Sequence, residues 1–169
     1  MVACAILVML WCGLNKVKRE TIMLCNAVIN GLWGIHFLLL GAVTGAFCGM
    51  VCVAMVLTFI FKGKVKLLSS NWVPMVFILI YIITGIVTWQ NAFSLIAIAA
   101  NSLLVIALWL SKEISIKFTC IFVGILMLIY NMLFFSLIGV IGQAISMIAN
   151  ITYTVKHFDE LKKVLKIEK

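Results

Sequence analysis

The chain has 169 residues, of which 66% are hydrophobic and 11% are charged, and its mean hydropathy is +1.28. A soluble domain carries roughly 25% charged residues, so this composition excludes a soluble globular protein and indicates an integral membrane protein with several spans. The net charge of +8 is spread over short basic patches that flank apolar segments. That distribution is typical of membrane topology and does not indicate a nucleic-acid partner.

Seven apolar segments follow one another along the chain, and about 20 residues are needed for each crossing. The first, residues 2–14, is short for a full crossing and is either completed by flanking residues or truncated at its start. The others are predicted at residues 21–40, 42–61, 72–89, 92–110, 118–135 and 138–155. In the tail that follows, Phe158, Leu161 and Leu165 recur at helical spacing, which predicts either an extension of the last helix or an amphipathic helix at the membrane surface.

The basic residues support a count of seven spans. With seven spans, the segments after the first, third and fifth spans lie on the same side as the C-terminal tail, and together they hold all 13 Lys and Arg residues. By the positive-inside rule this side is cytoplasmic, so the N-terminus is predicted outside and the C-terminus inside. We expect the same basic loops to contact anionic lipid headgroups.

The second and third predicted spans resemble the sixth and seventh. A shift of 95 residues places His36 on Asn131 and Gly41 on Ser136, and a tight turn joins each pair of spans. We therefore predict an all-α integral membrane protein whose seven transmembrane helices form a 3+1+3 parallel repeat. Its single membrane domain comprises a first three-helix bundle (residues 1–62), a linker helix (72–89), a second three-helix bundle (91–156) and a cytoplasmic tail (157–169).

Small residues recur at intervals of four on the third and seventh predicted spans. Gly41, Gly45 and Gly49 form a ladder of the kind that lets a neighbouring helix approach closely in lipid. Gly142 and Ser146 are its counterpart on the seventh span. We predict that these five residues lie at helix contacts.

The turn sequences carry a resemblance to a known family. HFLLLGAVTGA at residues 36–46, with the later YN and SLIG segments, resembles the YgjV-like bacterial inner-membrane family, which is grouped with the PQ-loop and SWEET-like seven-helix proteins. The resemblance covers nearly the whole chain. It implies a 3+1+3 fold, a bacterial inner-membrane location and movement of a small solute between two three-helix bundles. The Pro-Gln pair of the PQ-loop proteins is absent, and Pro74 lies in the linker helix.

Candidate binding residues come from the polar side chains at membrane depth. None of the predicted spans contains Asp, Glu, Lys or Arg, the groups that ion-coupled transporters usually need in the membrane. Asn30 and Asn101 fall nearest mid-span, where alternating-access proteins bind substrate, and Trp33 shares the face of Asn30. We take these three, with His36 and Asn131, as candidates for binding a neutral polar solute. The alternative interpretation is that the same side chains make structural hydrogen bonds between helices.

Enzyme and cofactor chemistry are not expected. The six cysteines lie in apolar runs without paired spacing, as buried structural thiols do, and the chain lacks the spacing of a zinc protease, a serine hydrolase or a phosphate loop. We therefore expect no metal and no cofactor.

Two functions stay open from the sequence. The first is an uncoupled, facilitative transporter for a small neutral polar solute such as a sugar. The alternative is a non-transporting membrane protein that recognises a lipid, a peptide or a protein partner. A polar cavity that reaches Asn30 and Asn101 favours the first, and a closed bundle packed with Leu and Ile favours the second. The sequence predicts no oligomeric state.

Overall fold

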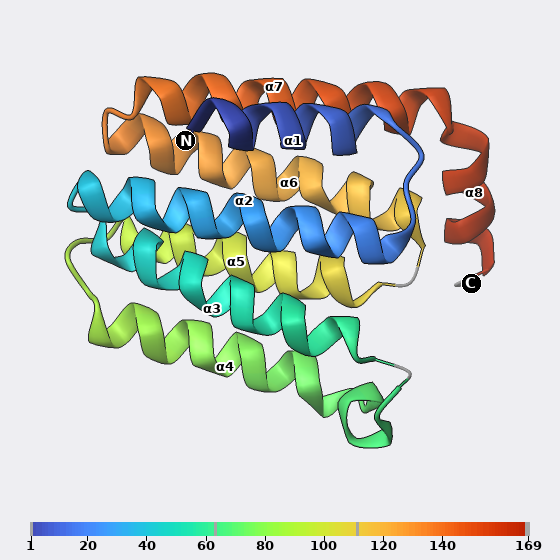
Figure 1. The fold of residues 1–169 in the computed structure, drawn as a ribbon, viewed down its shortest axis with the longest axis horizontal. Helices are drawn as coiled ribbons and strands as arrows, with labels where there is room; N and C mark the ends of the chain where they lie inside the picture. Colours follow the sequence, from blue (N-terminus) through green and yellow to red (C-terminus); the bar gives the residue numbers. More distant parts are fainter. Residues whose placement is uncertain (1, 63, 111, 168–169) are drawn as a thin grey trace.

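The computed structural model describes residues 2–62, 64–110 and 112–167, and almost all of this chain is helical (Figure 1). Seven α-helices, α1 to α7, follow the predicted spans, and an eighth helix forms most of the tail. A 3-10 turn, η1, lies between α3 and α4. The bounds are α1 Val2–Leu14, α2 Arg19–Leu39, α3 Val43–Ile60, η1 Lys66–Ser69, α4 Trp72–Val87, α5 Ser94–Trp109, α6 Glu113–Leu133, α7 Leu137–Lys156 and α8 Phe158–Ile167.

Four of these helices, α2, α3, α6 and α7, are long and apolar enough to cross a membrane. The shorter apolar helices are α1, α4 and α5, and α4 and α5 have 16 residues each. At 1.5 Å per residue, 16 residues extend about 24 Å, which is less than the ~30 Å hydrocarbon core of a typical bilayer. The sequence predicts a short first helix, and α1 is short. The question whether α1 is complete concerns Met1, which lies outside the described residues.

The helix α6 begins five residues earlier than predicted. It starts at Glu113 instead of Phe118, because Glu113 and Lys117 stand one turn apart and form an ion pair of 2.9 Å that stabilises the first turn. The expectation that no span contains a charged residue is therefore wrong. Lys117 lies inside a candidate span and is 2% exposed.

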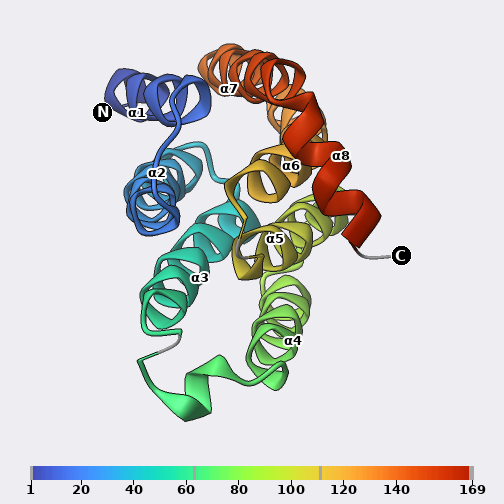
Figure 2. The ribbon, with the colours of Figure 1, turned by 90° about the vertical axis from the view of Figure 1, so that its right-hand side faces the viewer.

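Six of the helices lie side by side and form a closed ring when viewed along their axes (Figure 2). Around this ring, α1 contacts α2, α2 contacts α3, α3 contacts α5, α5 contacts α6, α6 contacts α7, and α7 returns to α1. Helix α4 packs outside the ring against α3 and α5. Helix α8 crosses one end of the bundle and contacts α6 and α7 (Figure 1).

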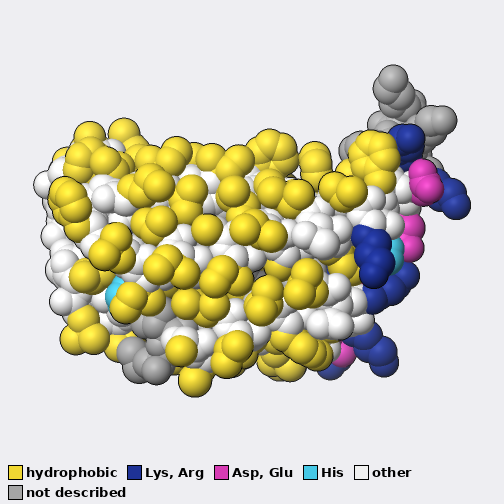
Figure 3. Space-filling model, turned by 90° about the horizontal axis from the view of Figure 1, so that it is seen from above, with side chains coloured by type: hydrophobic (Ala, Val, Ile, Leu, Met, Phe, Trp, Pro, Cys, Tyr) yellow, Lys and Arg dark blue, Asp and Glu magenta, His cyan; other side chains and the backbone are white. Residues whose placement is uncertain are grey.

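The face of the bundle drawn in Figure 3 is largely apolar along its length, and its charged residues gather at one end. Leu39, Val87 and Leu137 are each more than three-quarters exposed, as expected for side chains that face lipid. The charged end of the bundle includes the C-terminal ends of α1, α3 and α5, the N-terminal ends of α2 and α6, and the helix α8. The tail is thus a separate amphipathic helix. Its Leu161 is buried and Phe158 is half exposed, whereas the side chain of Leu165 lies outside the described residues.

The turn between α2 and α3 depends on Gly41. The Gly41 N–H donates to the carbonyl of Leu38 and the Ala42 N–H donates to that of Phe37, which is the Schellman arrangement that ends a helix. Gly41 has φ +74°, a conformation that L side chains rarely adopt. No atom lies within 4 Å of where a Cβ would stand. The prediction that Gly41 belongs to a packing ladder is wrong, because the residue ends α2.

The turn between α6 and α7 has the same hydrogen bonds. The Phe135 N–H donates to Met132 and the Ser136 N–H to Asn131, and Phe135 takes the left-handed place with φ 53°. Phe135 therefore corresponds to Gly41, 94 positions away. The predicted shift of 95 residues is wrong by one at this turn. The starts of α2 and α6, Arg19 and Glu113, keep the same spacing of 94.

The closest backbone approach between α2 and α3 occurs at Gly49. A Cβ on Gly49 would stand 2.7 Å from the carbonyl oxygen of Asn30 and 2.9 Å from the Cα of Gly34. On the other side of the ring, a Cβ on Gly13 would stand 2.7 Å from the Cβ of Ala149, where α1 meets α7. Small residues thus set the helix separation here, because dispersion contacts hold helices together in lipid.

We predict that Gly49→Ala destabilises the protein by about 1–3 kcal/mol and lowers its melting temperature in detergent by roughly 5 °C. The added methyl group meets backbone atoms of α2, which move only if the helix moves. The matched control is Gly31→Ala on α2, where the nearest atom to the new Cβ is a Val53 methyl carbon at 3.7 Å. Equal melting temperatures for the two variants would contradict the close approach.

A second pair of variants tests the equivalence of the two turns. Phe135→Gly is expected to stabilise the protein by about 0.5–1 kcal/mol, because it relieves a left-handed conformation at a side chain that is 89% exposed. Gly41→Ala is expected to have the opposite sign and a similar size. Thermal unfolding of both purified variants gives the answer, and a loss of stability in both would contradict the strain at Phe135.

Candidate functional site

A cavity of about 110 Å³ lies inside the ring of helices. Its wall has residues from α1, α2, α3, α5, α6 and α7, and none from α4. The volume is large enough for several water molecules or a small solute. Besides apolar groups, the wall carries the side-chain amides of Asn26, Asn30, Asn101, Asn131, Gln143 and Asn150.

Four of the five candidate binding residues line this cavity. They are Asn30 and Trp33 on α2, Asn101 on α5 and Asn131 on α6. The arrangement brings together residues that are far apart in sequence, because α5 and α6 face α2 across the ring. His36, the fifth candidate, is absent from the wall.

The asparagines of the cavity are held by their own helices. Each donates its Nδ2 group to the backbone carbonyl four residues earlier, at 2.7 to 3.0 Å. Because the acceptor is a carbonyl oxygen, the nitrogen of each amide must face it, and the Oδ1 atom takes no part in this hydrogen bond. Within the described residues these Oδ1 atoms accept no hydrogen bond, so these asparagines do not form the hydrogen bonds between helices that the alternative interpretation gives. The five are Asn26, Asn30, Asn101, Asn131 and Asn150.

Aromatic side chains pack at the end of the cavity opposite the charged residues. Trp33 stacks with Phe37 at 5.9 Å between ring centroids, and Phe37 meets the edge of Tyr130 at 5.5 Å. Two of the predicted packing glycines make room for these rings. A Cβ on Gly45 would stand 2.9 Å from the Tyr130 hydroxyl, and one on Gly142 would stand 3.2 Å from Trp33.

His36 and Ser146 have other positions than predicted. The Nε2 atom of His36 lies 2.9 Å from the hydroxyl of Ser136, which also accepts the N–H of Gly139 at the start of α7. His36 therefore connects α2 to α7 at the turn end of the bundle. Ser146, predicted at a helix contact, lies on the cavity wall.

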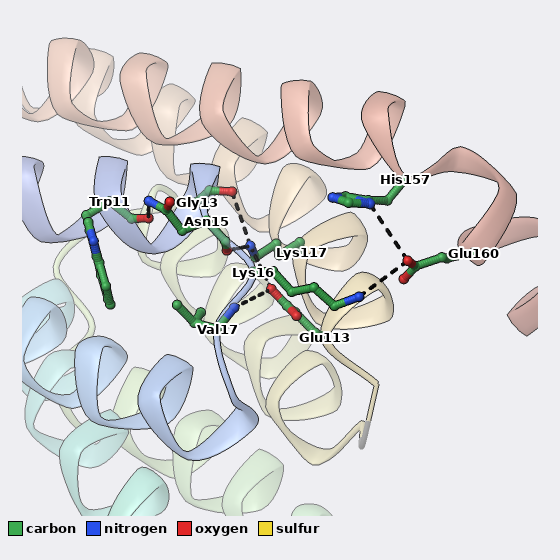
Figure 4. A network of polar contacts seen from close by, with 9 residues as sticks. All are labelled: Trp11, Gly13, Asn15, Lys16, Val17, Glu113, Lys117, His157 and Glu160. Atoms are coloured by element: carbon green, nitrogen blue, oxygen red, sulfur yellow. Dashed lines mark hydrogen bonds and ion pairs between the residues drawn. The ribbon is translucent and has the colours of Figure 1, made fainter.

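Lys117 is a charged residue of the cavity wall that the sequence analysis missed (Figure 4). Its ammonium group donates to the carbonyls of Gly13 at 3.2 Å and Asn15 at 2.5 Å, and pairs with Glu113. The ammonium also lies 3.4 Å from the ring centre of Tyr153. The spacing of Glu113 and Lys117 was the signal in the sequence for an earlier start of this helix, since oppositely charged residues at i and i+4 stabilise a helix. Lys117 lines the charged end of the cavity.

The end of α5 is capped in a similar way, by cations of α2 and of the segment after α3. Arg19 donates to the carbonyls of Leu108 and Leu110, both at 3.2 Å, and Lys62 donates to that of Trp109 at 2.8 Å. Lys62 also lies over the Trp109 ring, 3.7 Å from its centre. Burial, and then the positive charge of Arg19, lower the pKa of Lys62. The cations thus donate hydrogen bonds to backbone carbonyls that have no partner within the helix, because they lie at its end.

The described residues offer no metal centre, since no group of three or more His, Cys, Asp or Glu side chains gathers there. The polar side chains of the cavity wall are amides, one serine hydroxyl, the Trp33 indole, two thiols and a lysine that is already paired. Such a wall suits hydrogen bonding to a neutral molecule.

The comparisons with known proteins agree with this picture of a helical membrane protein. A family model described as a bacterial inner membrane protein, Imp-YgjV, matches residues 1–160. No curated protein and no solved structure matches the chain. The family match covers nearly the entire sequence and accords with the several apolar helices. The chain therefore belongs to the Imp-YgjV family of bacterial inner membrane proteins and is a multi-pass protein of that membrane.

Proposed function

We propose that this protein is an uncoupled transporter of a small neutral polar solute across the bacterial inner membrane. The observation that carries the proposal is the cavity inside the ring, whose wall includes Asn30 and Asn101 from opposite sides. In a bundle closed by Leu and Ile, unpaired amide oxygens at this depth would serve no purpose. In a transporter these oxygens accept hydrogen bonds from the donors of a bound solute, such as the hydroxyl groups of a sugar.

The helix contacts support a 3+1+3 parallel repeat, in which α1–α3 and α5–α7 are equivalent bundles and α4 is the linker. Exchanging α1, α2 and α3 with α5, α6 and α7 turns each contact of the ring into another contact of the ring. The equal spacing of 94 between both helix starts and turn residues supports the same assignment. The cavity then lies between the two bundles, as in transporters built from parallel repeats.

The charges near the cavity favour passive transport of a neutral molecule. Of the described ionisable side chains, Lys117 is the charged one on the wall, and Glu113 already pairs with it. A carboxylate that takes up and releases a proton is the usual means of coupling to the proton gradient. Without such a group on the wall, we assign the protein to facilitative transport.

Flux into proteoliposomes tests the proposal directly. We expect uptake of small neutral sugars or polyols above that of empty liposomes, and a fall of about fivefold in Asn101→Ala, since one hydrogen bond is worth about 1 kcal/mol. Asn71→Ala is the matched control, because Asn71 is exposed outside the cavity and makes no side-chain cap. Folded protein without flux for any tested solute would favour the alternative, a membrane protein that recognises a lipid, peptide or protein partner.

We further propose that the charged end faces the cytoplasm, with the N-terminus outside, and that its basic residues contact anionic lipid headgroups. A green fluorescent protein fused to the C-terminus is expected to fluoresce, whereas alkaline phosphatase fused there is expected to be inactive. The opposite pair of results would reverse the orientation.

A further inference from the structure

The ends of two helices, α1 and α5, are held by cations from the opposite bundle. Lys117 of α6 donates to Gly13 and Asn15 at the end of α1. Arg19 of α2 donates to Leu108 and Leu110 at the end of α5. Both contacts lie at the charged end of the molecule, and each joins one proposed bundle to the other.

The two contacts correspond in the helices that they join, although the shift of 94 residues places Arg19 on Glu113 and not on Lys117. Helix α2 corresponds to α6, and α1 corresponds to α5, so each bundle supplies a cation from its second helix to the first helix of its partner. A helix C-terminus carries partial negative charge and unsatisfied carbonyls, and a cation that donates hydrogen bonds there satisfies both. Both bundles must stay together at this end for these bonds to exist.

The Lys117 contact is reinforced by neighbouring groups (Figure 4). Glu113 accepts the backbone N–H of Val17 at 3.0 Å, so the segment after α1 is bound at two points. Lys16 in this segment also pairs with Glu160 of α8 at 3.4 Å. The segment between α1 and α2 is thus bound to both α6 and α8.

The opposite end of the bundle is held by neutral groups. His36 meets Ser136 at 2.9 Å, and the hydroxyl of Thr44 meets that of Ser94 at 3.1 Å. The connection between bundles therefore differs in kind at the two ends, with ammonium and guanidinium groups at the charged end and uncharged hydrogen bonds at the turn end.

We propose that Lys117 and Arg19 are positioning residues that hold the charged end of the cavity closed, and that the solute leaves or enters at this end when their bonds to α1 and α5 break. The part of this inference that concerns the passage of a solute rests on the proposed transport function. The bonds themselves are a property of the fold, so access to the cavity can be measured without any substrate.

The native cysteines report this access. Cys12 of α1 and Cys120 of α6 line the cavity, and Cys120 lies one turn beyond Lys117. Cys48 and Cys52 are fully buried away from the cavity wall and serve as internal controls. The experiment measures labelling of membrane vesicles of both orientations by a membrane-impermeant maleimide, with the modified cysteines identified by mass spectrometry. Lys66→Cys in a parallel sample marks the side on which the charged end lies.

We expect Lys117→Met and Arg19→Gln each to raise the labelling rate of Cys12 and Cys120 about tenfold from the charged side, with Cys48 and Cys52 unchanged. The matched control is Lys66→Gln, because Lys66 is exposed and has no hydrogen bond or ion pair to any residue that the structure describes. It is expected to leave labelling unchanged.

Unchanged labelling of Cys12 and Cys120 in both variants, with melting temperatures that show folded protein, would overturn the proposal. Labelling of Cys48 and Cys52 at the same raised rate would also overturn it, since it would indicate general loosening. Raised cavity labelling without solute flux in the wild-type protein would support the closure and refute transport. Flux with unchanged labelling in the variants would do the reverse.

Discussion

Hydrocarbon offers no hydrogen bonds, so a polar group inside the membrane is stabilised by a partner within the protein. The structure meets this constraint in two ways. The asparagines of the cavity donate to their own helices, and the ends of α1 and α5 receive cations from across the ring. Both solutions leave a consequence. The first leaves amide oxygens without a partner on residues of the cavity wall, and the second binds the two halves of the ring together at the charged end.

The two ends of the molecule are consequently different. At the turn end, two tight turns with the same hydrogen bonds reverse the chain, and uncharged contacts such as His36 with Ser136 join the halves. At the other end, the helices stop at basic segments whose side chains cap neighbouring helices. The family match agrees with an inner membrane setting for such a molecule, and the polar cavity between the halves is the basis for proposing transport.

Much of the helix pattern could be predicted, because apolar segments interrupted by basic residues are a strong signal. The prediction failed where one residue type serves two purposes. Gly41 has the four-residue spacing of a packing ladder, yet its turn requires a positive φ. Phe135 takes the same conformation without being glycine, so the sequence comparison aligned Gly41 with Ser136 instead of with Phe135. The sequence analysis places Lys117 just before the sixth span, in a basic segment outside the membrane, but its partners make its burial possible.

The sequence by itself determined that this is a multi-span helical membrane protein with its charge on one side, because hydropathy and charge are properties of each segment alone. It also indicated Asn30, Trp33, Asn101 and Asn131 as candidate binding residues, since polar and aromatic residues at mid-span call for a structural or functional explanation. Only the tertiary structure decided that these four share one cavity, that His36 lies outside it and that Lys117 lines its charged end. Those facts depend on which helices become neighbours, and neighbours are set by close backbone approach and capping between segments distant in the chain.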